Sequence, residues 1–514
     1  MSVGSAPAPS TTRTRVSGVL AVATGLSLAE LLGALLGVLP SLVELVGGVV
    51  VEASPPQVTD LAIAALGPAN VIVLQAGIVL VALGIGTAVG AVGARRFSLA
   101  ASAIAAFALL GAGSALRDAS YGLAPALIPA AVGAVTAILV LRWLLHRSGS
   151  AVGVRAVEGR RAFLRGALGV ATLALTGGVA GRVLSARAGS AGEAVTARAR
   201  IEVPLVPDRL PPPAGEASLD IDGLSPLHTP NGDFYIVDTA IRSPQVDPGG
   251  WALRIDGLVD RPLRFDHDEL LDMSTDEADI LLTCVSNEVG GDLAGTARWQ
   301  GVRLDTLLDR AGVKPSGTQV IGRSVDGFTA GFPTTAALDG RDALVAVAMN
   351  GEVLPIAHGF PARLVVAGLY GYVSATKWLS EIELATDEVD GYWVPRGWAK
   401  EAPVKVASRI DVPSDGQDVE EGLVAVAGVA WAPLAGVGAV QVRVDDGPWE
   451  EATLAEELSA VSWRQWHFEW RAAVGAHSLS VRAIDRDGTA QVGEESPPRP
   501  AGATGYHRIA ARVV

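Results

Sequence analysis

Five long apolar stretches in the first 200 residues constrain this chain most. Each is nearly free of charge and reaches about the twenty residues that a helix needs to cross the hydrocarbon core of a bilayer. They cover residues 16–39, 71–92, 98–116, 123–145 and 162–183. We therefore expect an all-α transmembrane bundle of five helices over residues 15–187. A shorter apolar run, 41–51, contains Glu44 and a Gly-Gly pair, and we expect it to lie at the interface or to re-enter.

The charges between these stretches predict their orientation. Loops that we assign to the cytoplasmic side carry Arg13, Arg15, Arg95, Arg96, Arg142, Arg147, Arg155, Arg160 and Arg161. The opposite loops carry Glu44, Glu52 and Asp60, then Arg117 beside Asp118. Because cytoplasmic loops are enriched in Lys and Arg, residues 1–14 form a cytoplasmic tail, and the chain after about residue 187 lies on the outer face of the cell membrane. Four spans would leave it inside, so the fifth span decides the localisation.

Two features of the apolar half have alternative interpretations. Residues 160–165 (RRAFLR) precede the fifth stretch and resemble a twin-arginine export signal, although such arginines also simply flank membrane helices, and this pair is internal rather than N-terminal. Glu30 lies within the first stretch, where it is either a functional group or a carboxyl kept neutral inside the bundle. No histidine lies within the five stretches, which argues against a bis-histidine haem there.

The rest of the chain differs in charge and in pattern. Residues 1–200 hold 15 Lys and Arg against 7 Asp and Glu, whereas residues 201–514 hold 25 against 47, an acidic balance that argues against nucleic acid as a partner. We predict an Ala-, Gly- and Pro-rich linker at 188–223 and a mixed α+β domain at 224–402, with a helix at 304–311 and strands at 319–321 and 362–367.

Short strands with turn signals dominate the end of the chain. They cover 423–429, 437–444, 466–472 and 477–483, which predicts an immunoglobulin-like β-sandwich over 403–514. Five tryptophans in this region are most simply explained as core and edge packing, and a ligand-binding aromatic patch is the alternative. They are Trp431, Trp449, Trp463, Trp466 and Trp470.

Cys284 is the only cysteine, so the chain has no intrachain disulfide. It lies where an apolar strand enters a glycine-containing loop, TCVSNEVGG at 283–291. A thiol in this place is either inert and buried, or a nucleophile, or a soft ligand for a transition metal. Spacing alone does not separate these interpretations.

A second cluster places three cationic side chains within twenty residues. His358, Arg363 and Lys377 are interspersed with glycines, and the cluster is preceded by Asn350-Gly351. Arg offers a bidentate fork and Lys a point charge, while glycine lets backbone N–H groups approach an anion. The pattern indicates a phosphate-binding site, with basic residues on surface loops as the alternative.

At these residues the sequence resembles the sulfite oxidase family of molybdopterin-dependent oxidoreductases, in a membrane-anchored bacterial form. The resemblance runs from about residue 224 to the C-terminus, and no single motif carries it alone. The ordered motifs are TCVSNEVGG at 283–291, ARWQGV at 297–302, DGF at 326–328, MNG at 349–351, HGFPAR at 358–363, KW at 377–378, GVAWAP at 428–433 and WRQW at 463–466.

The resemblance implies a cofactor and its ligands. Cys284 would be the catalytic residue and the thiolate ligand of molybdenum, completing a sphere of one pterin dithiolene and oxo groups. The remaining cofactor-binding positions would be Asn231, Tyr235, Asp326, His358, Arg363, Thr376 and Lys377. The cofactor is thus molybdenum-molybdopterin with one pterin per metal, and the C-terminal domain resembles a module that in many members mediates dimerisation.

Two departures from the family bear on the function. Members that oxidise sulfite carry arginines four to five residues after the cysteine, whereas this chain has Glu288 and Val289. A carboxylate there would repel an anion, which disfavours sulfite as the substrate. The segment around Phe234 also lacks the Arg and His of sulfite oxidases, and the five-span half is absent from the soluble enzymes.

These observations support two main hypotheses. The first is a membrane-anchored oxidoreductase that transfers an oxygen atom on a small S- or N-oxide, exchanges electrons with quinone or a redox protein, and is able to form a homodimer. The second is a non-catalytic, membrane-tethered binding or assembly protein on the same fold. Cys284 together with the cationic cluster favours the first, because a scaffold needs neither. A transporter would need more polar groups in the spans than Glu30.

Overall fold

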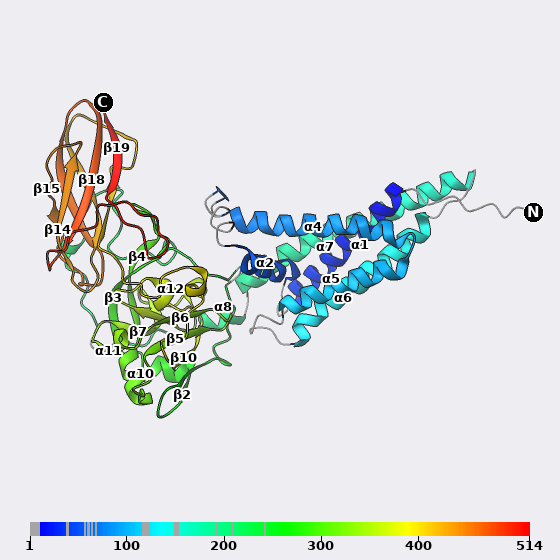
Figure 1. Ribbon diagram of the computed structural model, residues 1–514, viewed down its shortest axis with the longest axis horizontal. Helices are drawn as coiled ribbons and strands as arrows, with labels where there is room; N and C mark the ends of the chain where they lie inside the picture. Colours follow the sequence, from blue (N-terminus) through cyan, green and yellow to red (C-terminus); the bar gives the residue numbers. More distant parts are fainter. Residues whose placement is uncertain are drawn as a thin grey trace, which may run out of the picture. The chain divides into compact units, whose positions relative to one another are not determined.

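The computed structural model divides the chain into two compact units (Figure 1). The first is Met1–Thr196 with Ala240–Arg242, and the second is Ala197–Thr239 with Ser243–Val514. The structure describes residues 11–514 apart from 37–40, 56–57, 59–61, 63–64, 67–68, 116–122, 149–153, 192, 208 and 241–242.

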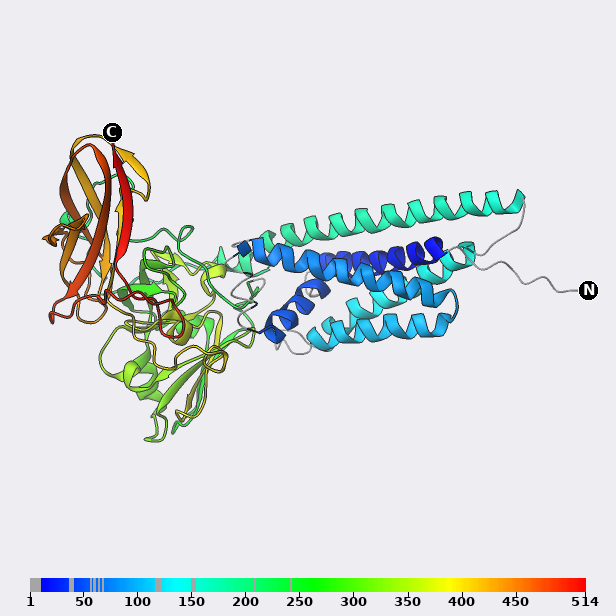
Figure 2. The same ribbon diagram turned by 45° about the horizontal axis from the view of Figure 1, so that its top comes forward.

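The first unit is helical, as the apolar stretches predict. Five of its helices are long and apolar enough to cross a membrane. They are α1 (Thr11–Leu36), α4 (Asn70–Gly93), α5 (Phe97–Ala115), α6 (Leu123–Ser148) and α7 (Val154–Ala191), and Figure 2 shows them running lengthwise through the unit. The expected number of apolar helices is therefore confirmed, and the crossing itself stays a prediction.

Close approach of small residues holds α1 at the centre of this unit, against α4, α6 and α7. A methyl group at Gly18 would overlap the carbonyl oxygen of Gly86 on α4, and one at Gly25 would lie 2.6 Å from the carbonyl oxygen of Gly133 on α6. Helices in lipid gain little from apolar burial alone, so van der Waals contact between backbones is a main source of their association.

The short run after α1 forms α2 (Leu42–Ala53), which packs against α4 and α5. Its N-cap is Ser41, whose Oγ accepts a hydrogen bond from the backbone N–H of Glu44 at 3.3 Å. Twelve residues at about 1.5 Å each are too few to cross a bilayer. The helix is thus compatible with the interfacial or re-entrant placement that its sequence predicts.

The second unit begins with an α+β region built on two sheets. One sheet has the order β2-β1-β10-β5-β6, and the other has the order β3-β4-β7-β8, with β9 also paired to β7. Their strands are β1 (Ala252–Gly257), β2 (Leu263–Asp266), β3 (Asp276–Thr283), β4 (Ala294–Arg303), β5 (Gln319–Ser324), β6 (Thr329–Pro333), β7 (Ala343–Met349), β8 (Glu352–Val353), β9 (Arg363–Val366) and β10 (Leu379–Ala385).

Four short helices accompany these sheets: α9 (His267–Asp272), α10 (Leu304–Ala311), α11 (Thr335–Leu338) and α12 (Gly371–Ser374). The helix predicted at 304–311 is confirmed as α10, which buries Leu304, Leu307 and Leu308. The strands predicted at 319–321 and 362–367 are confirmed as β5 and β9. The α10 leucines join Leu253, Ile255 and other strand residues in one apolar core.

The C-terminal region is β-rich, and its two sheets share one apolar core. The first has the order β11-β13-β17-β16 and the second β12-β19-β18-β14-β15. The strands are β11 (Ala407–Val412), β12 (Gln417–Val419), β13 (Gly422–Trp431), β14 (Val437–Val444), β15 (Glu450–Glu451), β16 (Thr453–Leu454), β17 (Arg464–Ala472), β18 (Gly475–Asp485) and β19 (His507–Val513).

Sequence patterning found four of these strands, which are β13, β14, β17 and β18. Of the five tryptophans assigned to packing, Trp431, Trp463, Trp466 and Trp470 are buried. Trp449 is half-buried and lies under the guanidinium groups of Arg443 and Arg482, which is edge packing rather than core.

The predicted linker is more structured than its composition indicates. α7 continues to Ala191, and α8 (Glu193–Arg198) follows it. Beyond these helices the proline-rich segment is fixed to the second unit: the carbonyl oxygen of Pro204 accepts from Gln300 Nε2 at 2.8 Å, and that of Pro211 accepts from Arg298 Nη1 at 3.1 Å. Because proline has no backbone N–H, its carbonyl oxygen is the only backbone group through which it forms hydrogen bonds.

Candidate active site

A pocket in the second unit collects most of the residues that the sequence singles out. Tyr235, Cys284, Asp326, His358, Arg363 and Lys377 all line it. They come from four separate places along the chain: the irregular segment 234–239, the end of β3, the turn between β5 and β6, and the region around β9 and α12. The other lining residues are Phe234, Val237, Asp238, Thr239, Leu282, Ser324, Phe328, Gly371, Tyr372, Ala375, Trp378 and Trp393.

Cys284 follows directly on the last residue of β3, as its sequence context predicts. Its backbone N–H donates to the carbonyl oxygen of Leu293 at 2.9 Å, and its carbonyl oxygen accepts from the N–H of Asn287 at 3.0 Å. These bonds fix the turn that presents the side chain to the pocket. Burial raises the pKa of the Cys284 thiol, while hydrogen bonds from Ser286 oppose that shift.

The cationic end of the pocket centres on Arg363, which is only 5% exposed. Its guanidinium donates to carbonyl oxygens, Nη1 to His358 at 3.0 Å and Nη2 to Ala375 at 3.4 Å, and lies over the Trp299 ring. Among the described residues it makes no ion pair with a carboxylate. Burial lowers the pKa of Arg363 to about 10, so the group remains a cation at neutral pH.

Lys377 is also buried but has an acidic partner that the sequence did not reveal. Its Nζ lies 2.6 Å from Asp238 Oδ2 and donates to the carbonyl oxygen of Ala357 at 3.1 Å. Burial lowers the pKa of Lys377, and the charge of Asp238 opposes that shift. An anion that enters the pocket therefore meets Lys377 already paired and Arg363 without a counter-charge.

His358 contributes a hydrogen bond rather than a charge. Its Nε2 lies 2.8 Å from the carbonyl oxygen of Asn231, which accepts only, so Nε2 carries the proton. Burial, with the nearby charges of Arg363 and Lys377, lowers the pKa of His358 to about 4. The ring is neutral at pH 7. The adjacent Gly359 has φ +112, and a side chain there would press on Arg363 and Lys377.

Asn231 and Thr376 lie beside the pocket rather than on its lining. The Asn231 amide binds Met349 and Asn350, so the Met-Asn-Gly motif anchors the 229–231 turn. Thr376 is fully buried, and its Oγ1 has no hydrogen-bond partner among the described residues. Tyr235 lies near both Cys284 and Arg363, and burial raises the pKa of its hydroxyl well above the ordinary value.

An aromatic wall, which the sequence reasoning missed, flanks the same pocket. Phe328, Tyr372 and Trp393 line it. Tyr392 and Trp398 connect these rings, with centroid distances of 5.7 Å for Phe328–Tyr392, 5.1 Å for Tyr392–Trp393 and 6.0 Å for Tyr372–Trp398. The sequence feature that could have indicated this wall is the aromatic-rich run GYWVPRGW at 391–398, which belongs to no predicted helix or strand.

The loop after Cys284 is held by the C-terminal sheets. Arg409 Nη1 donates to the carbonyl oxygen of Gly291 at 2.7 Å, and the His507 ring occupies the place that a side chain at Gly290 (φ +77) would need. Glu288 and Val289, which stand where sulfite-oxidising members carry arginines, are exposed on this loop and outside the pocket lining.

Comparison with known proteins identifies relatives of this chain. Residues 240–393 match the model of the oxidoreductase molybdopterin binding domain. The chain is 28% identical to the mitochondrial sulfite oxidase of Rattus norvegicus over 341 residues, covering 56% of this chain and 62% of that protein. It is 34% identical over 172 residues to the uncharacterized oxidoreductase YuiH of Bacillus subtilis, covering 34% of this chain and 79% of YuiH.

The chain belongs to the sulfite oxidase family of molybdopterin oxidoreductases. It spans 62% of the length of the rat relative and 56% of that of the human mitochondrial sulfite oxidase. Among solved structures, the sulfane dehydrogenase SoxCD from Paracoccus pantotrophus matches with a TM-score of 0.48 and 22% identity, over 60% of this chain and 88% of that one.

The family implies a molybdenum-molybdopterin cofactor, and the pocket fits this group in two respects. Arg363 offers a buried cation without a carboxylate partner in the described structure, as an anionic group requires. Cys284 lines the same pocket and offers a thiolate, which is a soft donor for a transition metal.

Proposed function

We propose that this chain is a membrane-anchored molybdenum-molybdopterin oxidoreductase that transfers an oxygen atom to or from a small substrate. The observation that carries the proposal is that one pocket holds a buried thiol, Cys284, and a buried cation, Arg363, which has no carboxylate partner among the described residues. A binding protein on the same fold would have no use for this pair. When bound, the cofactor supplies two-electron oxygen-atom chemistry at molybdenum.

Each side chain of the pocket then has a defined task. Cys284 would hold the metal as a thiolate, and because burial raises its pKa, the thiol is protonated in the cofactor-free fold. Arg363 and Lys377 would provide positive charge for the pterin phosphate, and Asp326 and Tyr235, which line the same pocket, would contact the cofactor. Neutral His358 donates from Nε2 to the carbonyl oxygen of Asn231, and this bond fixes the ring beside Arg363 and Lys377. Thr376 supplies a further hydroxyl.

The pocket wall favours an uncharged substrate, such as an S-oxide or an N-oxide, over sulfite. Among the described lining residues the only cationic types are His358, Arg363 and Lys377, all of which we assign to the cofactor. Phe328, Tyr372 and Trp393 offer ring faces instead, and such faces pack against apolar groups. The loop after Cys284, residues 285–293, contains no Lys or Arg that would attract an anion.

The first unit serves as the membrane anchor in this proposal. Leu80, Leu110, Leu168 and Leu175 are each about 70% exposed, a surface suited to lipid and costly in water. With Arg-rich loops inside, five spans place the second unit outside the cytoplasmic membrane, which agrees with export of a folded cofactor protein through the arginine pair at 160–161. Quinone or a separate redox protein exchanges electrons with it.

We keep the domain boundaries proposed from the sequence, with the linker at 188–223, the cofactor domain at 224–402 and the immunoglobulin-like domain at 403–514. The two sheets around a common core support the last assignment. Dimerisation through that domain is part of the proposal, and sedimentation of the purified full-length protein tests it.

Two measurements test the proposed function. Purified full-length protein should contain molybdenum and pterin in equal amounts, and it should reduce S- or N-oxides with a reduced dye in preference to oxidising sulfite. The aromatic wall variant Trp393→Ala should raise KM for the oxide while the molybdenum content stays constant. A protein free of molybdenum and pterin, purified from cells that make the cofactor, would contradict the enzyme and favour the binding protein.

A further inference from the structure

The loop that follows Cys284 is fixed by contacts from two strands of the C-terminal region. Arg409 of β11 donates from Nη1 to the carbonyl oxygen of Gly291 at 2.7 Å. The ring of His507 of β19 lies so close to Gly290 that a methyl group there would be 2.2 Å from the ring atom Cδ2. The Gly-Gly pair at the end of the cysteine motif is therefore a contact point for the C-terminal sheets.

Arg409 also binds the segment that supplies another wall of the pocket. Its Nη2 donates to Ser225 Oγ at 2.7 Å, and its Nε lies 2.7 Å from Asp411 Oδ1. The other carboxylate oxygen of Asp411 accepts from the backbone N–H of Ser225 at 3.1 Å. The chain runs from Ser225 to Tyr235, which lines the pocket, without forming a helix or a strand. One guanidinium thus joins two segments that contribute side chains to the same pocket.

Two more side chains of the C-terminal region hold this second segment. Gln465 Nε2 donates to the carbonyl oxygen of Ser225 at 2.8 Å, and Trp463 Nε1 donates to that of Leu227 at 2.8 Å. Because the segment has no ladder of its own, these bonds from the C-terminal region set the position at which it starts toward the pocket.

Backbone hydrogen bonds connect the bound end of the cysteine loop to the thiol. The N–H of Gly291 donates to the carbonyl oxygen of Glu288 at 2.9 Å. The N–H of Cys284 donates to the carbonyl oxygen of Leu293 at 2.9 Å, and its own carbonyl oxygen accepts from Asn287 at 3.0 Å. A displacement of Gly291 therefore moves the short turn that carries the Cys284 side chain.

We propose that Arg409, paired with Asp411, is a positioning residue that sets the place of the Cys284 thiol relative to the wall formed by residues 225–239. The inference rests on the proposed function, in which Cys284 holds the metal. The side chains of Arg409 and Asp411 are only 11% and 8% exposed. Such a buried pair keeps one geometry, because separating its charges leaves each without a partner.

The planar fork of arginine suits this task. Nε, Nη1 and Nη2 of Arg409 each bind a different acceptor, on β11, on the cysteine loop and on the 225–239 segment. A lysine has a single nitrogen on a flexible stem and does not reproduce this arrangement. The C-terminal region is then a part of the active site as well as a candidate dimerisation domain.

The test uses Cys284 as its own probe, because it is the only thiol in the chain. The rate of alkylation by iodoacetamide is measured on full-length protein purified from cells that do not make the cofactor. Arg409→Gln combined with Asp411→Asn removes both charges together, so that neither is left buried and unpaired. The control is Arg482→Gln, because the Arg482 guanidinium lies over the Trp449 ring within the C-terminal sheets.

We expect the double variant to react about tenfold faster or more, and Arg482→Gln less than about twofold faster, because only the former frees the cysteine loop. Arg409→Lys keeps the positive charge beside Asp411 and loses the fork, so it should also react faster. In cofactor-loaded protein, the electron paramagnetic resonance signal of the partly reduced metal should change in Arg409→Lys and stay as in the wild type in Arg482→Gln.

Three results would overturn the proposal. They are equal alkylation rates in all proteins, equal acceleration in the double variant and in Arg482→Gln, and wild-type behaviour of Arg409→Lys in both measurements. The alkylation rates need no metal, so they test the positioning role separately. Molybdenum content of wild type from cells that make the cofactor tests the proposed function.

Discussion

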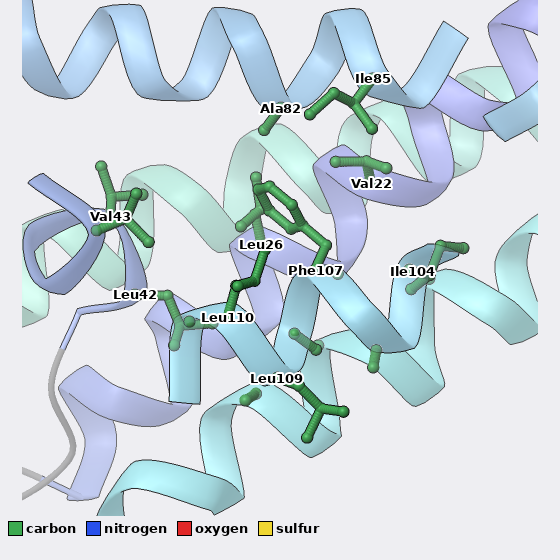
Figure 3. Close-up of a pocket in the computed structure, with 18 of the residues that line it drawn as sticks. Val22, Leu26, Leu42, Val43, Ala82, Ile85, Ile104, Phe107, Leu109 and Leu110 are labelled. Carbon is green, nitrogen blue, oxygen red and sulfur yellow. The ribbon is translucent and has the colours of Figure 1, made fainter. Parts of the chain in front are cut away.

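The two units of this chain each contain a pocket, and the two pockets differ in the polarity of their lining. The pocket of the first unit is lined almost entirely by apolar side chains from α1, α2, α4, α5 and α6 (Figure 3). The pocket of the second unit gathers a thiol, Cys284, with the cationic side chains of Arg363 and Lys377. In the first, glycine contacts between helices create the packing; in the second, the ends of strands converge.

This difference predicts different sensitivities. A polar site tolerates the loss of a charged or hydrogen-bonding side chain poorly, because every buried donor that loses its partner costs desolvation energy. The helix bundle depends instead on volume, since its backbones touch at glycines. Charge-removing substitutions should therefore damage the second unit most, and methyl additions the first.

The largest expected effect is at Arg363. Arg363→Ala removes the buried cation, and truncating one partner of a buried charge pair costs several kcal/mol, so cofactor affinity should fall by about 100-fold or more. Pterin released from the purified protein, measured by fluorescence after oxidation, reports this loss. Arg341→Ala is the matched control, because Arg341 pairs with Asp339 away from the pocket. Equal pterin in both variants would show that Arg363 does not hold the phosphate.

A methyl group tests the bundle. Gly18→Ala on α1 must push against the backbone of α4, whereas Gly84→Ala on α4 meets nothing within 4 Å. We expect Gly18→Ala to cost about 2 kcal/mol, which lowers the melting temperature of a unit of this size by about 5 °C, and Gly84→Ala to cost little. Size-exclusion chromatography of heated, detergent-solubilised protein measures both. Equal melting curves would mean that α1 and α4 are not in backbone contact.

The smallest effect concerns pH and His358. In the cofactor-free fold its pKa is about 4, below the unfolded value of about 6.5, so the unfolded state binds more protons between these values. The contribution of His358 to the free energy of unfolding is therefore fully present above pH 6.5 and is lost as the pH falls toward 4.

Urea unfolding of wild type and His358→Gln at pH 7 and pH 4.5 isolates this contribution. Burial also lowers the pKa of His267 and His507, but these residues are present in both proteins. The wild type should lose more stability than the variant on acidification. Parallel losses would place the His358 ring in solvent.

Local patterns in the sequence were enough to predict much of this fold. Apolar length gave the five helices, and the spacing of leucines gave α10. β19 alternates buried and exposed residues along 508–513, and it was missed because the exposed position between Ile509 and Ala511 is an alanine, so the sequence there does not alternate in polarity. β11 was missed because its residues are mixed in polarity. Its pairing with β13, which makes it a strand, is a tertiary contact.

The site was predictable where a motif is local and not where it depends on contacts between distant segments. Cys284, His358, Arg363 and Lys377 stand in short motifs, so the family resemblance located them. Asp238 is 139 residues from its partner Lys377, and nothing in its neighbourhood marks it. The positions of Asn231 and Thr376, beside the pocket rather than on it, likewise depend on tertiary packing that no local pattern encodes.

The number of sulfur ligands per molybdenum atom tests the central claim most directly. X-ray absorption at the molybdenum edge of purified wild type and Cys284→Ser measures it. The account predicts one sulfur fewer per metal in the variant, or loss of the metal with the pterin retained. An unchanged sulfur number with unchanged molybdenum content would show that Cys284 is not a ligand, and the proposed active site would be wrong.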